Sequence, residues 1–116
     1  IPDNNIYNNQ NIVKVITREN LNISKFSEAI AFKRKIMNQS NNIYHHLGIY
    51  CYELDILKKF VSFKQSENEI KYKLEQLRAL DNNIKVHVGL AKSSPIGVDT
   101  QEDFVAIKKI MEYKLK

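Results

Sequence analysis

The spacing of the apolar residues changes period several times along this chain, and this change limits the choice of fold more than any other feature of the sequence. Between residues 84 and 90 every second residue is apolar, which is the spacing of a half-buried strand. Between residues 67 and 80 the apolar residues recur every three or four positions, which is typical of an amphipathic helix. A chain of 116 residues is also the size of one domain with a modest core. We therefore predict an α/β fold in a single domain.

The clearest predicted strand covers residues 46–52. One of its faces would carry His46, Gly48, Tyr50 and Tyr52, and the other face would pack in the core. A glycine inside a strand often marks the close approach of a ligand or another backbone, so we expect open space beside the His46 face. Weaker strand patterns lie at residues 12–16 and 84–90, whereas residues 24–37 fit neither period.

Two capping patterns predict where helices begin. Ser66 is followed three residues later by Glu69, which predicts a helix over residues 67–80. Thr100 and Asp103 repeat this pattern and predict a terminal helix. A shorter amphipathic helix is expected after Glu53. The terminal helix is expected to turn three apolar side chains inward, namely Phe104, Ile107 and Met111.

The composition favours an intracellular protein without a nucleic-acid or membrane partner. The net charge is +5, but the lysines are scattered and do not form a basic block interleaved with aromatic residues, so a nucleic-acid-binding module is the weakest of our alternatives. Cys51 is the only cysteine, which excludes an intramolecular disulfide and a cysteine-rich zinc site. The chain contains no stretch of about 18 apolar residues. We expect a cytoplasmic location.

The residues alone leave the chemistry of the chain open. Three glycines are too few for a glycine-rich phosphate loop, and the histidines lack the spacing of a zinc site. Asp99 lies in a turn directly before the terminal helix, where it could be an ordinary turn residue or a ligand for a hard cation such as Mg²⁺. His46, Glu75 and Gln76 fit a structural or solvent-exposed role more readily than a functional one.

Three short motifs occur in an order and spacing that resemble the 3-deoxy-manno-octulosonate cytidylyltransferases, also called CMP-Kdo synthetases. They are His-Leu-Gly-Ile-Tyr at 46–50, Leu-Glu-Gln-Leu-Arg at 74–78 and Gly-Val-Asp-Thr at 97–100. Residues 11–16 are also similar to the Asn-x-Val-Lys-Val-Val strand of that family. Phe32-Lys33-Arg34 resembles its Phe-Ser-Arg segment, although Lys33 replaces the serine. Tyr72 stands where the family usually has a glutamate.

This resemblance implies the C-terminal part of a nucleotide-diphospho-sugar transferase fold, a three-layer α/β sandwich with a mixed sheet. Residues 1–116 would then be a partial domain, the sugar- and metal-binding half, without the N-terminal half that binds CTP. The implied reaction transfers a cytidylyl group from CTP to 3-deoxy-manno-octulosonate (Kdo), giving CMP-Kdo and pyrophosphate for lipopolysaccharide synthesis. The isolated chain is expected to be inactive.

The resemblance also implies roles for particular residues and partners. Arg34, His46, Glu75 and Gln76 would bind Kdo, and Asp99 would bind Mg²⁺. An arginine can pair with a carboxylate through two hydrogen bonds, and the other side chains can hydrogen-bond hydroxyls. The expected partners are CTP, Kdo and either a separate N-terminal half or a second copy of the chain. The alternative function is a catalytically silent, dimerising interaction domain derived from that family.

Overall fold

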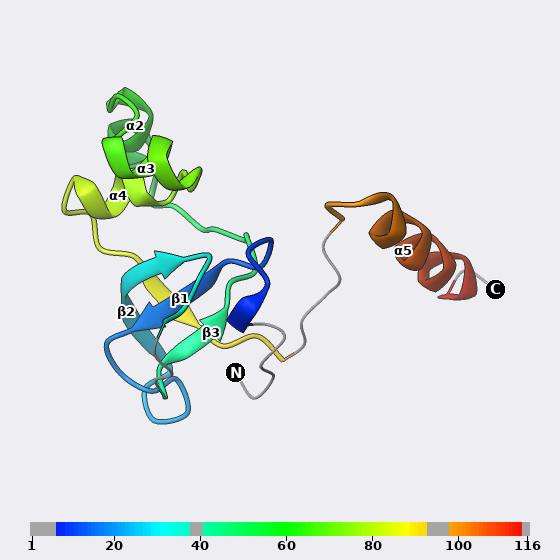
Figure 1. The fold of residues 1–116 in the computed structure, drawn as a ribbon. Coiled ribbons are helices and arrows are strands. Elements are labelled where there is room, and N and C mark those ends of the chain that lie inside the picture. The colour runs from blue at the N-terminus through cyan, green and yellow to red at the C-terminus, as the bar shows by residue number, and fades with distance from the viewer. Residues whose placement is uncertain (1–6, 38–40, 93–97, 115–116) are drawn as a thin grey trace.

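The computed structural model describes residues 7–37, 41–92 and 98–114. In these segments the strands form one curled sheet, helices α2, α3 and α4 gather at one end of it, and helix α5 stands apart (Figure 1). None of the described helices is long and apolar enough to cross a membrane. The elements in chain order are β1 (Lys14–Thr17), β2 (Phe26–Lys33), β3 (Ile43–His45), α2 (Leu54–Ser62), α3 (Glu67–Tyr72), α4 (Leu77–Asp81), β4 (His87–Gly89) and α5 (Gln101–Lys114).

The sheet has the strand order β3-β1-β2-β4. Strand β1 lies between β2 and β3, and β4 pairs with the outer side of β2. All three pairings are antiparallel. The sheet with its helices confirms the α/β class, whereas the parallel strands of a mixed sheet do not occur within the described part of the chain.

The core joins the sheet to the helices through leucine side chains. Val15, Ala29 and Phe32 from β1 and β2 are buried together with Leu74, which lies between α3 and α4 and is only 4% exposed. Complete burial of a leucine side chain stabilises a fold by about 1.5–3 kcal/mol. Leu74 is therefore the most deeply buried apolar contact between the two short helices and the sheet, and Leu77 and Leu80 of α4 pack against the same cluster.

A fully buried lysine ties the segment before β1 to the end of β2. The Nζ of Lys14 donates to the carbonyl oxygen of Asn9 at 2.7 Å and to that of Arg34. Burial, and secondarily the positive charge of Arg34, hold the pKa of Lys14 below its ordinary value. The amine is accommodated because backbone carbonyls replace the water that it loses on burial.

The predicted strand at 46–52 is wrong. Strand β3 ends at His45, and residues 46–53 have no regular secondary structure. Since His45 pairs with Lys14, the first residue of β1, the partner strand ends there, apart from one further bond from the His46 amide to the Val13 carbonyl. Ile49, which was expected in the core, is 85% exposed.

The helix expected at 67–80 begins as predicted but is broken in the middle. Ser66 and Glu69 form the complete capping box, since each side chain accepts a hydrogen bond from the backbone amide of the other residue. Lys73 then adopts the left-handed conformation, with φ 55° and ψ 47°, and ends α3. This break turns the chain so that Leu74 enters the core and α4 starts in a new direction.

The remaining predictions have mixed outcomes. The ambiguous segment 24–37 forms β2, the strands predicted at 12–16 and 84–90 are present as β1 and the short β4, and α2 follows Glu53 as expected. Helix α5 starts with the predicted capping box of Thr100 and Asp103. The prediction that its apolar residues face inward is wrong for Phe104 and Met111, which are 48% and 58% exposed.

We predict that Leu74→Ala lowers the free energy of unfolding by about 2–4 kcal/mol, because it removes buried methyl groups and leaves a cavity between helices and sheet. Urea denaturation followed by circular dichroism would measure the loss. The matched control is Leu54→Ala in α2, whose side chain is 62% exposed and whose replacement should cost less than about 1 kcal/mol. Equal losses in both variants would contradict the role assigned to Leu74.

Candidate functional site

The irregular segment after β3 carries a row of aromatic side chains that leads from the core to helix α2. We call Phe32, His46, Tyr50, Tyr52 and Phe60 the aromatic row. Neighbouring ring centroids in this row lie 5.4, 5.4, 6.0 and 5.8 Å apart. Aromatic pairs at such distances each contribute about 0.5–1.5 kcal/mol beyond the area they bury. The row therefore fixes the path of residues 46–52 without strand pairing.

His46 is held at three points. Its backbone amide donates to the Val13 carbonyl at 2.9 Å, and its ring meets the buried ring of Phe32 edge to face, at 82°. Its Nε2 lies 2.7 Å from the Tyr50 hydroxyl. Burial, followed by the neighbouring His45, holds the pKa of His46 below its ordinary value. Burial also raises the pKa of Tyr50 well above its ordinary range, with smaller contributions from Tyr52 and Glu75.

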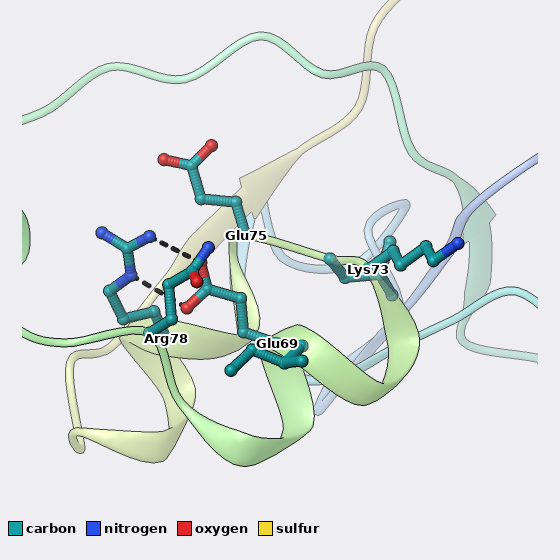
Figure 2. A pocket seen from close by; sticks show the side chains of 7 residues that line it. Glu69, Lys73, Glu75 and Arg78 are labelled. Carbon is teal, nitrogen blue, oxygen red and sulfur yellow. Dashed lines mark hydrogen bonds and ion pairs between the residues drawn. The ribbon is translucent and has the colours of Figure 1, made fainter.

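An ion pair between α3 and α4 stands at the other end of the aromatic row. Arg78 donates from Nη2 to Glu69 Oε1 at 2.5 Å and from Nε to Glu69 Oε2 at 3.0 Å (Figure 2). Its guanidinium lies over the ring of Phe60, 4.7 Å from the centroid. The hydrogen bonds from Arg78 hold the pKa of Glu69 below its ordinary value. Arg78 thus connects α2, α3 and α4.

Glu75 stands beside the buried Leu74, in the short connection between α3 and α4. Its carboxylate extends away from the Glu69–Arg78 pair, while the side chain of Lys73 points in the opposite direction from Arg78 (Figure 2). Burial and the negative charge of Glu75 both raise the pKa of Tyr52, and Glu75 also raises that of Tyr50. A hollow of about 560 Å³ is lined by Gln65, Glu69, Ile70, Lys73, Leu74, Glu75 and Arg78.

The structure therefore connects two of the predicted site residues with the same tyrosine. His46 is hydrogen-bonded to Tyr50, and the negative charge of Glu75 helps to raise the pKa of Tyr50, although His46 and Glu75 come from separate motifs. Gln76 is half-buried next to Glu75, at the start of α4, and its side chain makes no capping hydrogen bond. Its predicted role in sugar binding stays a prediction.

Arg34 is engaged elsewhere. Its guanidinium donates to three backbone carbonyls, those of Tyr72 at 3.2 Å, Lys73 at 3.1 Å and Gln10 at 3.2 Å. Two of these carbonyls lie at the C-terminal end of α3, where a positive charge is favourable. Pairing of Arg34 with a sugar carboxylate, as the resemblance implies, would have to compete with these bonds.

Asp99 lies just before α5, the helix that stands apart from the sheet and from α2, α3 and α4 (Figure 1). The residue is exposed, and its backbone amide donates to Asp103 Oδ2 at 3.2 Å. Within the described ranges, no three His, Cys, Asp or Glu side chains gather into a group that could hold a metal ion. One exposed carboxylate fits a Mg²⁺ ion that is held mainly by substrate phosphates and water, but it does not form a closed site.

Sequence reasoning missed the Glu69–Arg78 pair and the tie made by Arg34. Glu69 and Arg78 are nine positions apart, and this spacing gave no sign of a contact, because an unbroken helix would have placed the two residues on different turns. Tyr50 and Tyr52 were placed on the His46 face, but the expected strand did not predict that the tyrosine hydroxyl reaches the imidazole.

Comparison with models of known protein families finds no match. Comparison with curated proteins finds relatives along almost the whole chain. The chain is 40% identical over 112 residues to the 3-deoxy-manno-octulosonate cytidylyltransferase of Bartonella henselae, which covers 96% of this chain and 45% of that protein. It is 43% identical over 108 residues to the enzyme of the same name from Thermodesulfovibrio yellowstonii, which covers 89% of this chain and 42% of that protein. The chain thus spans less than half the length of these relatives.

The fold is similar to that of a solved structure described as CMP:2-keto-3-deoxy-manno-octonic acid synthetase complexed with CTP. The TM-score is 0.71 with 26% sequence identity, and the match covers 91% of this chain and 44% of that chain. The sequence and structure comparisons therefore agree with the resemblance of the three motifs.

We predict that Glu69→Gln lowers the free energy of unfolding by about 3 kcal/mol near neutral pH, because it leaves Arg78 largely buried without its anion. The lowered pKa of Glu69 stabilises the fold above the ordinary carboxyl pKa, and this contribution is lost as pH falls through the folded-state value. The gap between wild type and variant should therefore close in acid.

Urea denaturation at several pH values between about 6 and 3 would measure this gap. Glu67→Gln is the matched control, because Glu67 lies in the same first turn of α3 with an exposed side chain. A gap that stays constant down to the lowest pH would show that the ion pair is not the source of the stability.

Proposed function

We propose that this chain, which is related over nearly its whole length to the 3-deoxy-manno-octulosonate cytidylyltransferases, supplies the sugar-binding half of such an enzyme. The proposal is supported by Tyr50, whose hydroxyl lies 2.7 Å from Nε2 of His46 and whose pKa the charge of Glu75 helps to raise, since His46 and Glu75 belong to two separate motifs of the resemblance. The chain would act together with a second part that binds CTP. The length that the relatives have beyond the matched region supports this arrangement.

In the proposed reaction an oxygen of Kdo attacks the α-phosphorus of CTP, pyrophosphate leaves, and CMP-Kdo forms. Such transfers depend mainly on positioning the reactants and on stabilising charge at the phosphate. Glu75 would accept hydrogen bonds from sugar hydroxyls, His46 and Gln76 would add polar contacts, and Tyr50 and Tyr52 would cover an apolar side of the sugar. Their task is to place the attacking oxygen.

Asp99 would provide one carboxylate for Mg²⁺ in the assembled protein, with the CTP phosphates as further ligands. This bound ion would supply positive charge to the reacting phosphate. A cytoplasmic location is part of the same proposal, and the exposed single thiol of Cys51 supports it, because such thiols persist in reducing compartments.

We predict that mixing this chain with the N-terminal half of a related cytidylyltransferase, CTP, Kdo and Mg²⁺ produces pyrophosphate. Glu75→Ala and His46→Ala should each lower kcat/KM about tenfold, the equivalent of one hydrogen bond to the substrate. Asp55→Asn, on the exposed side of α2, is the control and should keep the activity of the mixture.

Two results would reject the proposal. One is pyrophosphate release at the background rate under all conditions in which both halves are folded. The other is activity that survives both substitutions unchanged, since the turnover would then come from elsewhere in the mixture.

The second candidate function is a catalytically silent, dimerising interaction domain. The apolar surface of α2 favours it, because Leu54 and Val61 are 62% and 66% exposed, and Ile70 of α3 is 59% exposed. Exposed apolar groups of this kind often mark interfaces. In that case light scattering should give twice the mass of the chain, and Val61→Asp should return it to the mass of one chain. A single-chain mass for the unmodified protein would contradict this candidate.

A further inference from the structure

We propose that Tyr50 is a positioning residue whose phenol O–H donates to Nε2 of His46 and thereby fixes the imidazole as the neutral tautomer with its proton on Nδ1. The hydrogen bond itself does not depend on the function proposed above. Only the identity of the ligand that His46 would meet rests on that function.

The geometry leaves the imidazole little freedom. The backbone of His46 is bonded to Val13, the ring meets Phe32 edge to face with centroids 5.4 Å apart, and Nε2 lies 2.7 Å from the Tyr50 hydroxyl. The ring of Tyr50 is in turn supported by Tyr52, at 6.0 Å between centroids. Rotation of the imidazole would break the hydrogen bond and the contact with Phe32 together.

The direction of the hydrogen bond follows from the two groups. A phenol oxygen shares its lone pair with the ring and is the better donor, whereas an unprotonated imidazole nitrogen is a strong acceptor. The surroundings also favour the neutral forms, since burial and His45 lower the pKa of His46, and burial, Tyr52 and Glu75 raise that of Tyr50. Because Nε2 accepts the hydrogen bond from the Tyr50 hydroxyl, the neutral imidazole must carry its proton on Nδ1.

This tautomer limits what His46 can do. A neutral imidazole whose Nε2 is occupied offers one N–H donor, on Nδ1, and no acceptor. Glu75, whose charge acts on the same tyrosine, offers the opposite, a carboxylate that only accepts. A hydroxyl group can accept from the first and donate to the second, whereas a carboxylate would be repelled by Glu75. We therefore infer that this part of the site recognises the hydroxylated carbon chain of the sugar acid rather than its carboxylate.

Nitrogen-15 NMR of the histidine rings in the 116-residue chain tests the proposal directly. We expect the His46 spectrum of the Nδ1–H tautomer at neutral pH. In Tyr50→Phe the titration midpoint of His46 should rise by roughly 0.5 to 1 pH unit, because the hydrogen bond that favours the neutral ring is lost. Tyr52→Phe is the matched control and should leave this titration unchanged, since the hydroxyl of Tyr50 is retained.

The Nε2–H tautomer in the unmodified chain would overturn the proposal, and this measurement needs no substitution. An identical His46 titration in Tyr50→Phe and wild type would overturn it as well. In the mixed-half assay, Tyr50→Phe should raise KM for Kdo roughly threefold to tenfold with a smaller effect on kcat. If the mixture releases no pyrophosphate at all, the proposed function fails while the NMR result stands by itself.

Discussion

The left-handed turn at Lys73 is the constraint on which the rest of the structure depends. It ends α3 after six residues, sends Leu74 into the core between the helices and β2, and starts α4 in a new direction. Arg34 binds the carbonyls of Tyr72 and Lys73 at this turn and so holds it from the side of the sheet. A non-glycine residue in this conformation costs about 1 kcal/mol or more, which the burial of Leu74 offsets.

The turn also places the polar groups of the candidate site. Glu75 follows Leu74 directly, and its charge helps to raise the pKa values of Tyr50 and Tyr52. Arg78, one turn later, reaches both Glu69 and Phe60. A straight helix through this region would have kept these contacts apart. The same local break thus places Leu74 in the core and brings Arg78 within reach of Glu69.

The sequence predicted those features that depend on neighbouring residues, and missed those that depend on tertiary contacts. The capping boxes at Ser66 and Thr100 involve residues three positions apart, so both could be recognised. The break at Lys73 could not, because the apolar stripe continues through it and only the core position of Leu74 explains it. The strand predicted at 46–52 failed because alternation shows which side chains share a face, but not whether a partner strand extends far enough to pair.

The predictions for the site divide in a similar way. His46 and Glu75 came from motifs, and in the structure His46 is hydrogen-bonded to Tyr50 while the charge of Glu75 acts on the same tyrosine. Arg34, in contrast, is held by backbone carbonyls, and Asp99 lies just before α5. No pattern in the sequence indicates that an arginine will bind carbonyls of a helix almost forty residues away. The aromatic row, in contrast, was partly visible, since alternation placed Tyr50 and Tyr52 with His46.

We propose above all that His46, Tyr50, Tyr52 and Glu75 form the surface on which the sugar acid binds. The most direct test of this proposal is the addition of Kdo to the isotope-labelled chain, followed residue by residue in NMR spectra. The account predicts concentration-dependent changes at His46, Tyr50 and Glu75, and none along α5. Changes confined to other surfaces, or no change at millimolar Kdo, would contradict it.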